Sequence, residues 1–210
     1  MSRSDDTPII YRHVWLYQAL MRVLHLRGYD GRYRVVADLV PEGCSVTELC
    51  AGDARLYLKY LQQKNVRYVA LDNSRPFVEA GRQAGIDFRE ANVRSDPVPE
   101  ADVVIIQAAF HIFHEHRDEV MAKLLGAARQ RLVIVEPVSN LSSSSNPLVA
   151  ALAKRLTKPR SGDGYVGFRY DAASFRAFAE AQPTFERLLA SPDGRENIAV
   201  FRSPRASVQP

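Results

Sequence analysis

Three short runs in the middle of the chain are apolar throughout and do not alternate with polar residues. They are residues 69–71, 103–106 and 132–135. A strand with one face in water alternates apolar and polar residues, whereas a strand covered by helices on both faces is apolar at every position. The runs therefore predict a parallel sheet that is buried between two layers of helices.

Helical segments separate the strand-like runs along most of the chain. The predicted strands span 45–50, 66–72, 86–90, 102–108 and 131–136, and the helices between them span 54–63, 75–84 and 115–129. This alternation is typical of the α/β class, with a doubly wound and mostly parallel sheet.

The C-terminal part departs from this alternation. A helix predicted at 171–181 is followed by two strand-like runs, 184–190 and 197–202. The sequence Ser191-Pro-Asp-Gly194 between them favours a tight turn, so the two runs are expected to form an antiparallel hairpin. The predicted sheet therefore has seven strands in total.

Residues 1–43 are predicted to form a helical cover at the N-terminus. An apolar stripe with helical spacing spans 11–27 and ends at Gly28, and a second helix is expected at about 32–40. The main domain is predicted to span 44–204, and cover and domain together form one structural domain.

Residues 139–170 are predicted to be an insert in that domain, placed around a site. The insert contains a basic helical segment at 147–158 and a loop at 159–164. Its cations would favour an anionic substrate or a lipid headgroup, although basic residues more commonly form a solvated surface.

The composition is that of an ordinary globular protein, with 46% hydrophobic and 25% charged residues among 210. Cys44 and Cys50 are six positions apart, which fits neither a disulfide framework nor a zinc site, and a reducing cytoplasmic setting is expected. No run approaches the roughly 18 apolar residues of a membrane span, and no leader sequence is expected.

The net charge of +4 is compatible with a nucleic-acid partner but is also common among soluble enzymes. The sequence contains no basic motif interleaved with aromatic residues, so a nucleic-acid partner is not expected.

The segment Glu48-Leu-Cys-Ala-Gly-Asp-Ala54 follows the first predicted strand. Ligands of doubly wound sheets bind where strands end, because small residues there let the backbone approach closely. A dinucleotide turn has the pattern G-x-G-x-x-G, but Gly52 is the only glycine in this segment. The turn is therefore a poor match for binding a pyrophosphate.

The same segment resembles the first motif of class I S-adenosylmethionine (SAM)-dependent methyltransferases, acidic-x-Gly-x-Gly-x-Gly. Cys50 and Ala54 replace the outer glycines. The resemblance, of the small-molecule type, implies SAM as the cofactor, bound in part by Glu48, Cys50, Gly52 and Asp53.

Asp72 ends the second predicted strand, and the resemblance implies that its carboxylate accepts hydrogen bonds from both ribose hydroxyls. Asn73, the next residue, is assigned to the same site. The alternative is that a polar residue here only caps the following helix, for which Ser74 is a candidate.

Ala91-Asn-Val93 falls after the third strand, where the family usually has an aspartate and a small or apolar residue. The resemblance implies that the Asn92 side-chain carbonyl accepts from the adenine amino group and that the Val93 amide donates to the ring. The alternative is an ordinary surface loop.

The fourth strand and its sequel, Asp102 to Phe113, resemble the fourth motif of the family, which often ends in a histidine. Gln107 and Ala108 would then lie beneath the methionine part of SAM, and His111 would lie at the mouth of the site. Ile134-Val-Glu-Pro137 and the C-terminal hairpin also resemble the family, so the resemblance extends from about 45 to 202.

Methyl transfer from a sulfonium is an in-line displacement and needs a base only when the acceptor carries a proton. His111 is the candidate base, and the alternative is a structural histidine. Glu136 is expected either to orient an acceptor or to fix a loop. His114 and His116 are two positions apart and cannot share a helical face, so no metal site is predicted.

The sequence thus predicts SAM-dependent methyl transfer to oxygen or nitrogen of a small molecule, with an anionic acceptor as one alternative. Aromatic residues of the N-terminal stripe would line the acceptor pocket or pack the helix onto the sheet: Tyr11, Trp15 and Tyr17. One alternative is an RNA or protein methyltransferase, although Gln107-Ala-Ala-Phe110 is not the Asn-Pro-Pro-Tyr acceptor motif. Another is a non-catalytic protein with the same fold.

Overall fold

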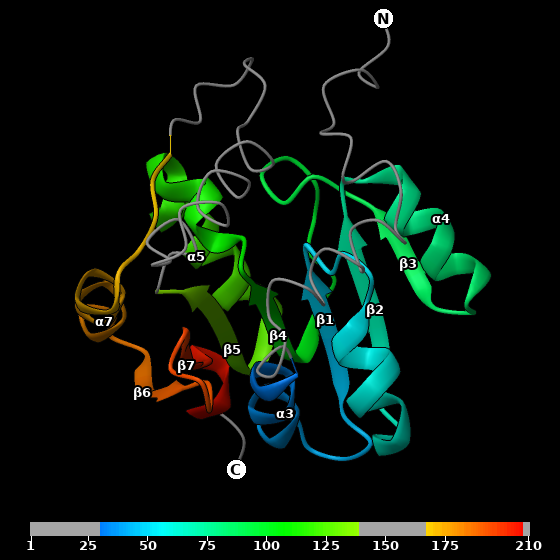
Figure 1. Ribbon diagram of the computed structural model, residues 1–210, viewed down its shortest axis with the longest axis horizontal. Helices are drawn as coiled ribbons and strands as arrows, with labels where there is room; N and C mark the ends of the chain where they lie inside the picture. The colour runs from blue at the N-terminus through cyan, green and yellow to red at the C-terminus, as the bar shows by residue number, and fades with distance from the viewer. Residues whose placement is uncertain (1–29, 139–166, 208–210) are drawn as a thin grey trace, which may run out of the picture.

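A seven-stranded sheet organises residues 30–138 and 167–207, which are the residues that the computed structural model describes. The strand order is β3-β2-β1-β4-β5-β7-β6 (Figure 1). The strands are β1 Ser45–Leu49, β2 Arg67–Asp72, β3 Asp87–Glu90, β4 Ala101–Gln107, β5 Ala128–Pro137, β6 Phe185–Ala190 and β7 Glu196–Arg202. The first five pair in parallel, and β7 pairs antiparallel with both β5 and β6. The predicted fold class is therefore confirmed.

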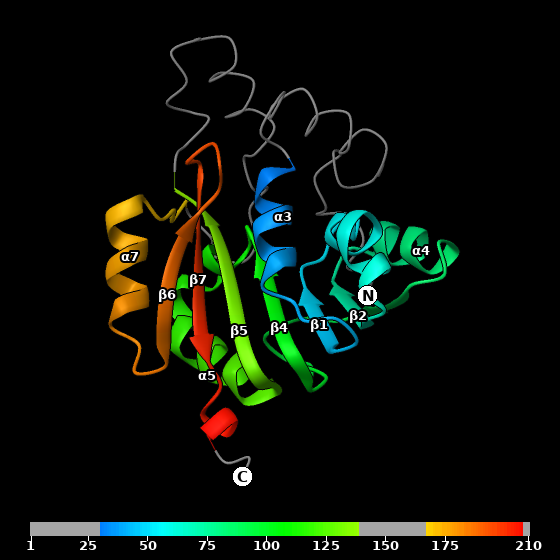
Figure 2. The same ribbon diagram turned by 90° about the horizontal axis from the view of Figure 1, so that it is seen from below.

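Helices cover both faces of the sheet (Figure 2). One face carries α3, the π-helical turn η1 and α4, and the other carries the 3-10 segment η3, α5 and α7. These elements are α3 Gly31–Asp38, η1 Tyr57–Leu61, α4 Arg75–Gln83, η3 Phe110–His116, α5 Arg117–Ala127 and α7 Ala172–Glu180; the short 3-10 turns η2 Gln62–Lys64 and η5 Pro204–Ser207 complete the set. The predicted helices at 11–27 and 147–158 lie outside the described residues.

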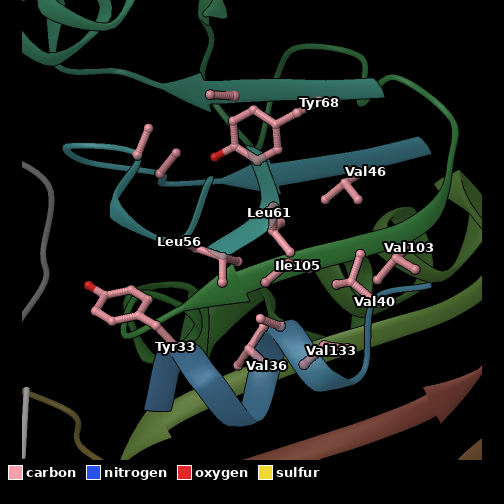
Figure 3. Close-up of a cluster of buried hydrophobic side chains, with 14 of the residues drawn as sticks. Tyr33, Val36, Val40, Val46, Leu56, Leu61, Tyr68, Val103, Ile105 and Val133 are labelled. Carbon is pink, nitrogen blue, oxygen red and sulfur yellow. The ribbon is translucent and has the colours of Figure 1, made fainter. Parts of the chain in front are cut away.

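Two hydrophobic clusters, one on each face, make up the core. Val36 and Val40 point toward Val103, Ile105 and Val133 of the sheet (Figure 3). The intervening strand residues pack on the opposite face with α5 and α7, and they include Val104, Ile106, Leu132 and Ile134. Successive residues of one strand point to opposite faces, so a strand with two covered faces must be apolar throughout.

The helical segment predicted at 54–63 is present, but it is not a regular α-helix. The chain instead forms η1, a π-helical turn, and continues into η2. Leu56 and Leu61 are five positions apart and both are fully buried. An α-helix would turn these two side chains about 140° apart, at 100° per residue, whereas the wider π-turn brings them to one side. The Tyr57 ring also stacks on Tyr68 of β2, with 4.4 Å between ring centroids.

Asp30 joins the start of α3 to the segment that follows β1. Its carboxylate accepts hydrogen bonds from the Arg55 guanidinium, at 2.8 Å from Nη2, and from Lys59. Because Arg55 directly follows the turn after β1, this contact holds one end of that turn against α3.

None of the helices in the described ranges is long and apolar enough to cross a membrane.

Candidate active site

The loops that follow β1, β2, β4 and β5 meet at the carboxyl edge of the sheet. The Ala51 N–H donates to the Leu71 carbonyl, and the Ala108 N–H donates to the Val135 carbonyl at 2.7 Å. The chain reverses its order in the sheet between β1 and β4, which are neighbours. Such a reversal point is where doubly wound sheets bind ligands.

The turn after β1 repeatedly adopts the left-handed backbone conformation. The φ angles are +53° at Cys50, +56° at Gly52 and +51° at Ala54. These are the three positions that carry glycine in the motif that the segment resembles. Ala108, after β4, has φ +54° as well. A left-handed residue other than glycine costs roughly 1–2 kcal/mol, so this edge of the sheet is strained.

The strain predicts that Ala108→Gly stabilises the fold. Ala108 is half-buried, so little packing is lost, and we expect the free energy of unfolding to rise by about 0.5–1 kcal/mol. The matched control is Ala80→Gly, at a half-buried position within α4, which is expected to lower it by about 1 kcal/mol. Urea unfolding of both variants measures whether each substitution raises or lowers the free energy of unfolding. A loss of stability in Ala108→Gly would contradict the strain argument.

Asp72 connects the turn after β1 to the start of α4. Its Oδ2 accepts from the Gly52 N–H at 2.9 Å, and its Oδ1 accepts from the Ser74 N–H at 2.8 Å. Burial raises the pKa of this carboxyl, and the N–H groups of Gly52, Ser74 and the exposed Asn73 oppose that shift. Each carboxylate oxygen has a further lone pair, so Asp72 can still accept from ribose hydroxyls.

Ser74 occupies the N-cap position of α4, but its side chain makes no capping hydrogen bond. Its hydroxyl oxygen is buried and has no partner in the described part of the chain. The Ser74 N–H at the helix start is held by Asp72, and ribose binding by Asp72 stays a prediction.

Glu48 is a buried carboxyl between the strands β2 and β4. The Tyr68 hydroxyl donates to its Oε2 at 2.6 Å, and the Gln107 amide nitrogen donates to its Oε1 at 2.8 Å. These contacts fix the orientation of the Gln107 amide. The amide oxygen of Gln107 is buried and has no partner among residues 30–138 and 167–207. It therefore fits the ammonium or hydroxyl donors of a ligand such as SAM.

Burial raises the pKa of Glu48 to about 7, and the nearby Asp53 carboxylate adds to this shift. The hydrogen bonds from Tyr68 and Gln107 and the charge of Arg32 act in the opposite direction. Because the folded state holds this proton at pH values where the unfolded state has lost it, stability is highest below the unfolded pKa and falls as pH rises to about 7.

We therefore expect the free energy of unfolding to fall by roughly 3 kcal/mol between pH 4.5 and 7 and then to level off. Glu48→Gln cannot titrate and is expected to remove most of this slope, whereas Glu90→Gln, at an exposed site on β3, is expected to keep it. Urea unfolding at several pH values measures the slope. Equal slopes in wild type and Glu48→Gln would rule out Glu48 as its source.

Cys50 lies in the middle of the site. Burial raises the pKa of its thiol well above the usual range, and the carboxylates of Asp72, Glu136 and Glu48 add to this shift in that order. The thiol thus stays protonated, which fits a wall residue and not a nucleophile.

Asn92 and Val93 follow β3. The Asn92 side-chain carbonyl accepts from the Arg94 N–H at 3.0 Å, and the Asn92 N–H donates to Asp96. Val93 is buried, and its carbonyl accepts from Lys123 at 2.8 Å. Asn92 is exposed and forms a local turn, as in the surface-loop alternative, and adenine binding by this pair stays a prediction.

His111 and Glu136 form a buried pair at the ends of β4 and β5. The His111 Nδ1 lies 2.7 Å from Glu136 Oε2, and the His111 backbone N–H donates to Oε1 at 3.2 Å. Because a carboxylate can only accept, Nδ1 carries the proton in this pair. Of the two roles expected for Glu136, the structure supports fixing a segment, and that segment contains the candidate base.

The other two histidines of this segment have different environments. The His114 ring stacks on Phe168, with 3.5 Å between ring centroids, and His116 lies 3.9 Å from Glu119. In the described ranges, no three histidine, cysteine or acidic side chains come together as metal ligands do.

The fold is that of SAM-dependent methyltransferases. A SAM-dependent methyltransferase from Thermotoga maritima superposes with a TM-score of 0.64 at 13% identity, covering 93% of this chain and 98% of that one. Human N-acetylserotonin methyltransferase, solved in complex with SAM, gives a TM-score of 0.62 at 15% identity, covering 97% of this chain and 60% of that one.

The sequence is similar to trans-aconitate 2-methyltransferases. The Mycobacterium marinum enzyme is 34% identical over 140 residues, which are 63% of this chain and 53% of the relative. The Mycobacterium tuberculosis H37Ra enzyme is 34% identical over 87 residues, which are 41% of this chain and 33% of that relative. The chain spans about half the length of the M. marinum relative that it matches. No protein-family model matches the chain. The resemblance to class I SAM-dependent methyltransferases is confirmed.

Proposed function

We propose that the chain transfers a methyl group from SAM to an oxygen or nitrogen of a small anionic molecule by in-line displacement. The observation that carries the proposal is the hydrogen bond from the Gly52 N–H to Asp72 Oδ2 at 2.9 Å, which joins the turn after β1 to the expected ribose acceptor. Asp72 belongs to the expected ribose side of the site, and Glu136 holds the candidate base. The expected ribose acceptor and the candidate base therefore both lie near the carboxyl ends of parallel strands of the sheet.

The residues at the sheet edge fit SAM by their hydrogen-bonding capacity. Asp72, with Gly52, Asp53 and Asn73 beside it, would hold the ribose, and Asn92 and Val93 would hold the adenine. Gln107, oriented by Glu48, would accept from the methionine ammonium beside Ala108, because its buried amide oxygen has no partner in the described ranges. When bound, SAM supplies an electrophilic methyl group on a sulfonium.

The curated relatives are named for trans-aconitate, a tricarboxylate, which supports a small anionic acceptor for this chain as well. A carboxylate oxygen is already deprotonated at neutral pH, so it needs orientation but no base. For a hydroxyl or amine acceptor, His111 would take the proton at Nε2, since Nδ1 is engaged by Glu136. Both cysteines in the chain are free, which fits the expected cytoplasmic setting.

Calorimetric titration of the full chain with SAM and with S-adenosylhomocysteine tests cofactor binding directly. We expect saturable binding of both, and no binding at high micromolar ligand would overturn the proposal. Incubation with SAM and trans-aconitate, with mass spectrometry of the products, then tests transfer. A methylated product together with S-adenosylhomocysteine is expected.

A further inference from the structure

We propose that Tyr170 and Arg117 bind a carboxylate of the methyl acceptor and so select an anionic substrate. This inference rests on the proposed function and adds two residues that the resemblance does not assign. Tyr170 precedes α7, and Arg117 is the first residue of α5. The two residues reach the site from different parts of the chain.

Tyr170 carries a buried polar atom in an apolar environment. The residue is 2% exposed, and its ring packs against Phe168, Phe175 and Phe178 at centroid distances of 4.8, 5.2 and 5.8 Å. Its hydroxyl is buried and the Arg117 guanidinium lies against it, but no group in the described ranges accepts its hydrogen. A buried hydroxyl hydrogen without an acceptor is destabilising, so a ligand acceptor at this point would relieve that penalty.

The Tyr170 hydroxyl is a donor at neutral pH. Burial raises its pKa to about 12, and the Arg117 charge is the largest influence in the opposite direction. Tyr170 and Arg117 both pack on the Phe178 ring, which places the guanidinium near the hydroxyl. A tyrosine hydroxyl and a guanidinium together present donors to an oxygen anion, and the guanidinium has no acceptor for an ammonium.

The surroundings of Arg117 favour an anion. Its guanidinium lies over the Phe178 ring, 5.8 Å from the centroid, and 41% of its side chain is exposed. Its Nε lies 3.5 Å from Asp118, whose own side chain is 85% exposed and therefore screened by water. The N–H groups at the start of α5 add positive potential beside Arg117, and the acidic residues of its first turn, Asp118 and Glu119, partly offset it.

The pair lies near η3, the segment that contains the candidate base. The Glu136 carboxylate, which holds His111, also raises the pKa of Tyr170, so the hydroxyl shares the electrostatic environment of the His111–Glu136 pair. The Phe168 ring stacks on His114 and packs edge-on against Tyr170. An acceptor with a carboxylate on Tyr170 and Arg117 would thus have the rest of its structure beside η3, which contains His111.

The test is calorimetric titration of the full chain, saturated with S-adenosylhomocysteine, with trans-aconitate. Tyr170→Phe removes only the hydroxyl and is expected to weaken trans-aconitate about tenfold. Arg117→Gln is expected to weaken it about 100-fold, with Arg117→Lys in between because the charge remains. Arg176→Gln, which breaks an exposed ion pair on α7, is the matched control and should bind as wild type does.

Affinity for S-adenosylhomocysteine separates binding of the acceptor from a structural effect. It is expected to stay within about twofold of wild type in all variants, because neither Tyr170 nor Arg117 belongs to the turn after β1 or to the hydrogen bonds of Asp72. Unchanged trans-aconitate affinity, or a parallel loss of both affinities, would overturn the inference. If the wild-type complex with S-adenosylhomocysteine does not bind trans-aconitate, the inference is overturned, but SAM-dependent transfer to another acceptor is not. Failure to bind S-adenosylhomocysteine at all would instead sink the proposed function.

Discussion

Asp72→Ala is expected to weaken SAM binding by about 100-fold, because a buried carboxylate that accepts from two ribose hydroxyls makes charge-assisted hydrogen bonds. The same change leaves the N–H groups of Gly52 and Ser74 without their acceptor. The turn after β1 and the start of α4 would then lose their common link. Calorimetric titration with SAM measures the effect.

Two further variants separate ligand binding from support of the backbone. Asp72→Asn keeps one acceptor oxygen and is expected to bind with intermediate affinity. Asp87→Ala removes an exposed carboxylate on β3 that pairs with Arg89, and it should leave SAM binding unchanged. Wild-type affinity in Asp72→Ala would show that the cofactor site has been misplaced.

Glu136→Ala is expected to lower kcat by about 100-fold while leaving SAM affinity unchanged. The substitution removes the acceptor of both the His111 ring and its backbone N–H, so the imidazole would lose its fixed orientation. Glu136→Gln keeps one acceptor oxygen but places an amide donor opposite a second donor. The kcat of Glu136→Gln is therefore expected to be roughly tenfold below that of wild type. Steady-state turnover of an acceptor that carries a hydroxyl or amine group provides the measurement, because a carboxylate acceptor needs no base.

The two members of the pair should also act as a unit. His111→Ala is expected to lose about as much kcat as Glu136→Ala, and the double variant should lose little more, because each change disables the same group. Additive losses would indicate two independent roles. Normal turnover in either single variant would remove the pair from the mechanism.

The sheet could be predicted from sequence because burial on both faces constrains every residue of a strand. Val103 to Ile106 can only be apolar when helices cover both sides of β4, and this requirement is visible without coordinates. The π-turn could not be predicted in the same way. Its signal is the spacing of five positions between Leu56 and Leu61. A search for apolar residues spaced three or four positions apart does not detect it.

The partners within the site depended on strand order, which periodicity does not specify. Glu48 meets Tyr68 and Gln107 because β1 lies between β2 and β4. Likewise, Glu136 meets His111 only because β5 pairs in parallel with β4, with Val135 opposite Gln107. The individual residues were recognisable as polar groups after apolar strands, but which of them touch follows from the sheet.

The left-handed turn at Cys50, Gly52 and Ala54 also bears on how such chains are found. A search written in residue letters looks for three glycines and sees one, whereas a search written in dihedral angles would find the complete motif. What the turn retains is a backbone path, and alanine and cysteine follow it at an energetic penalty. Other chains with this fold and few glycines would be recovered by screening structures for three left-handed residues at alternate positions after the first strand.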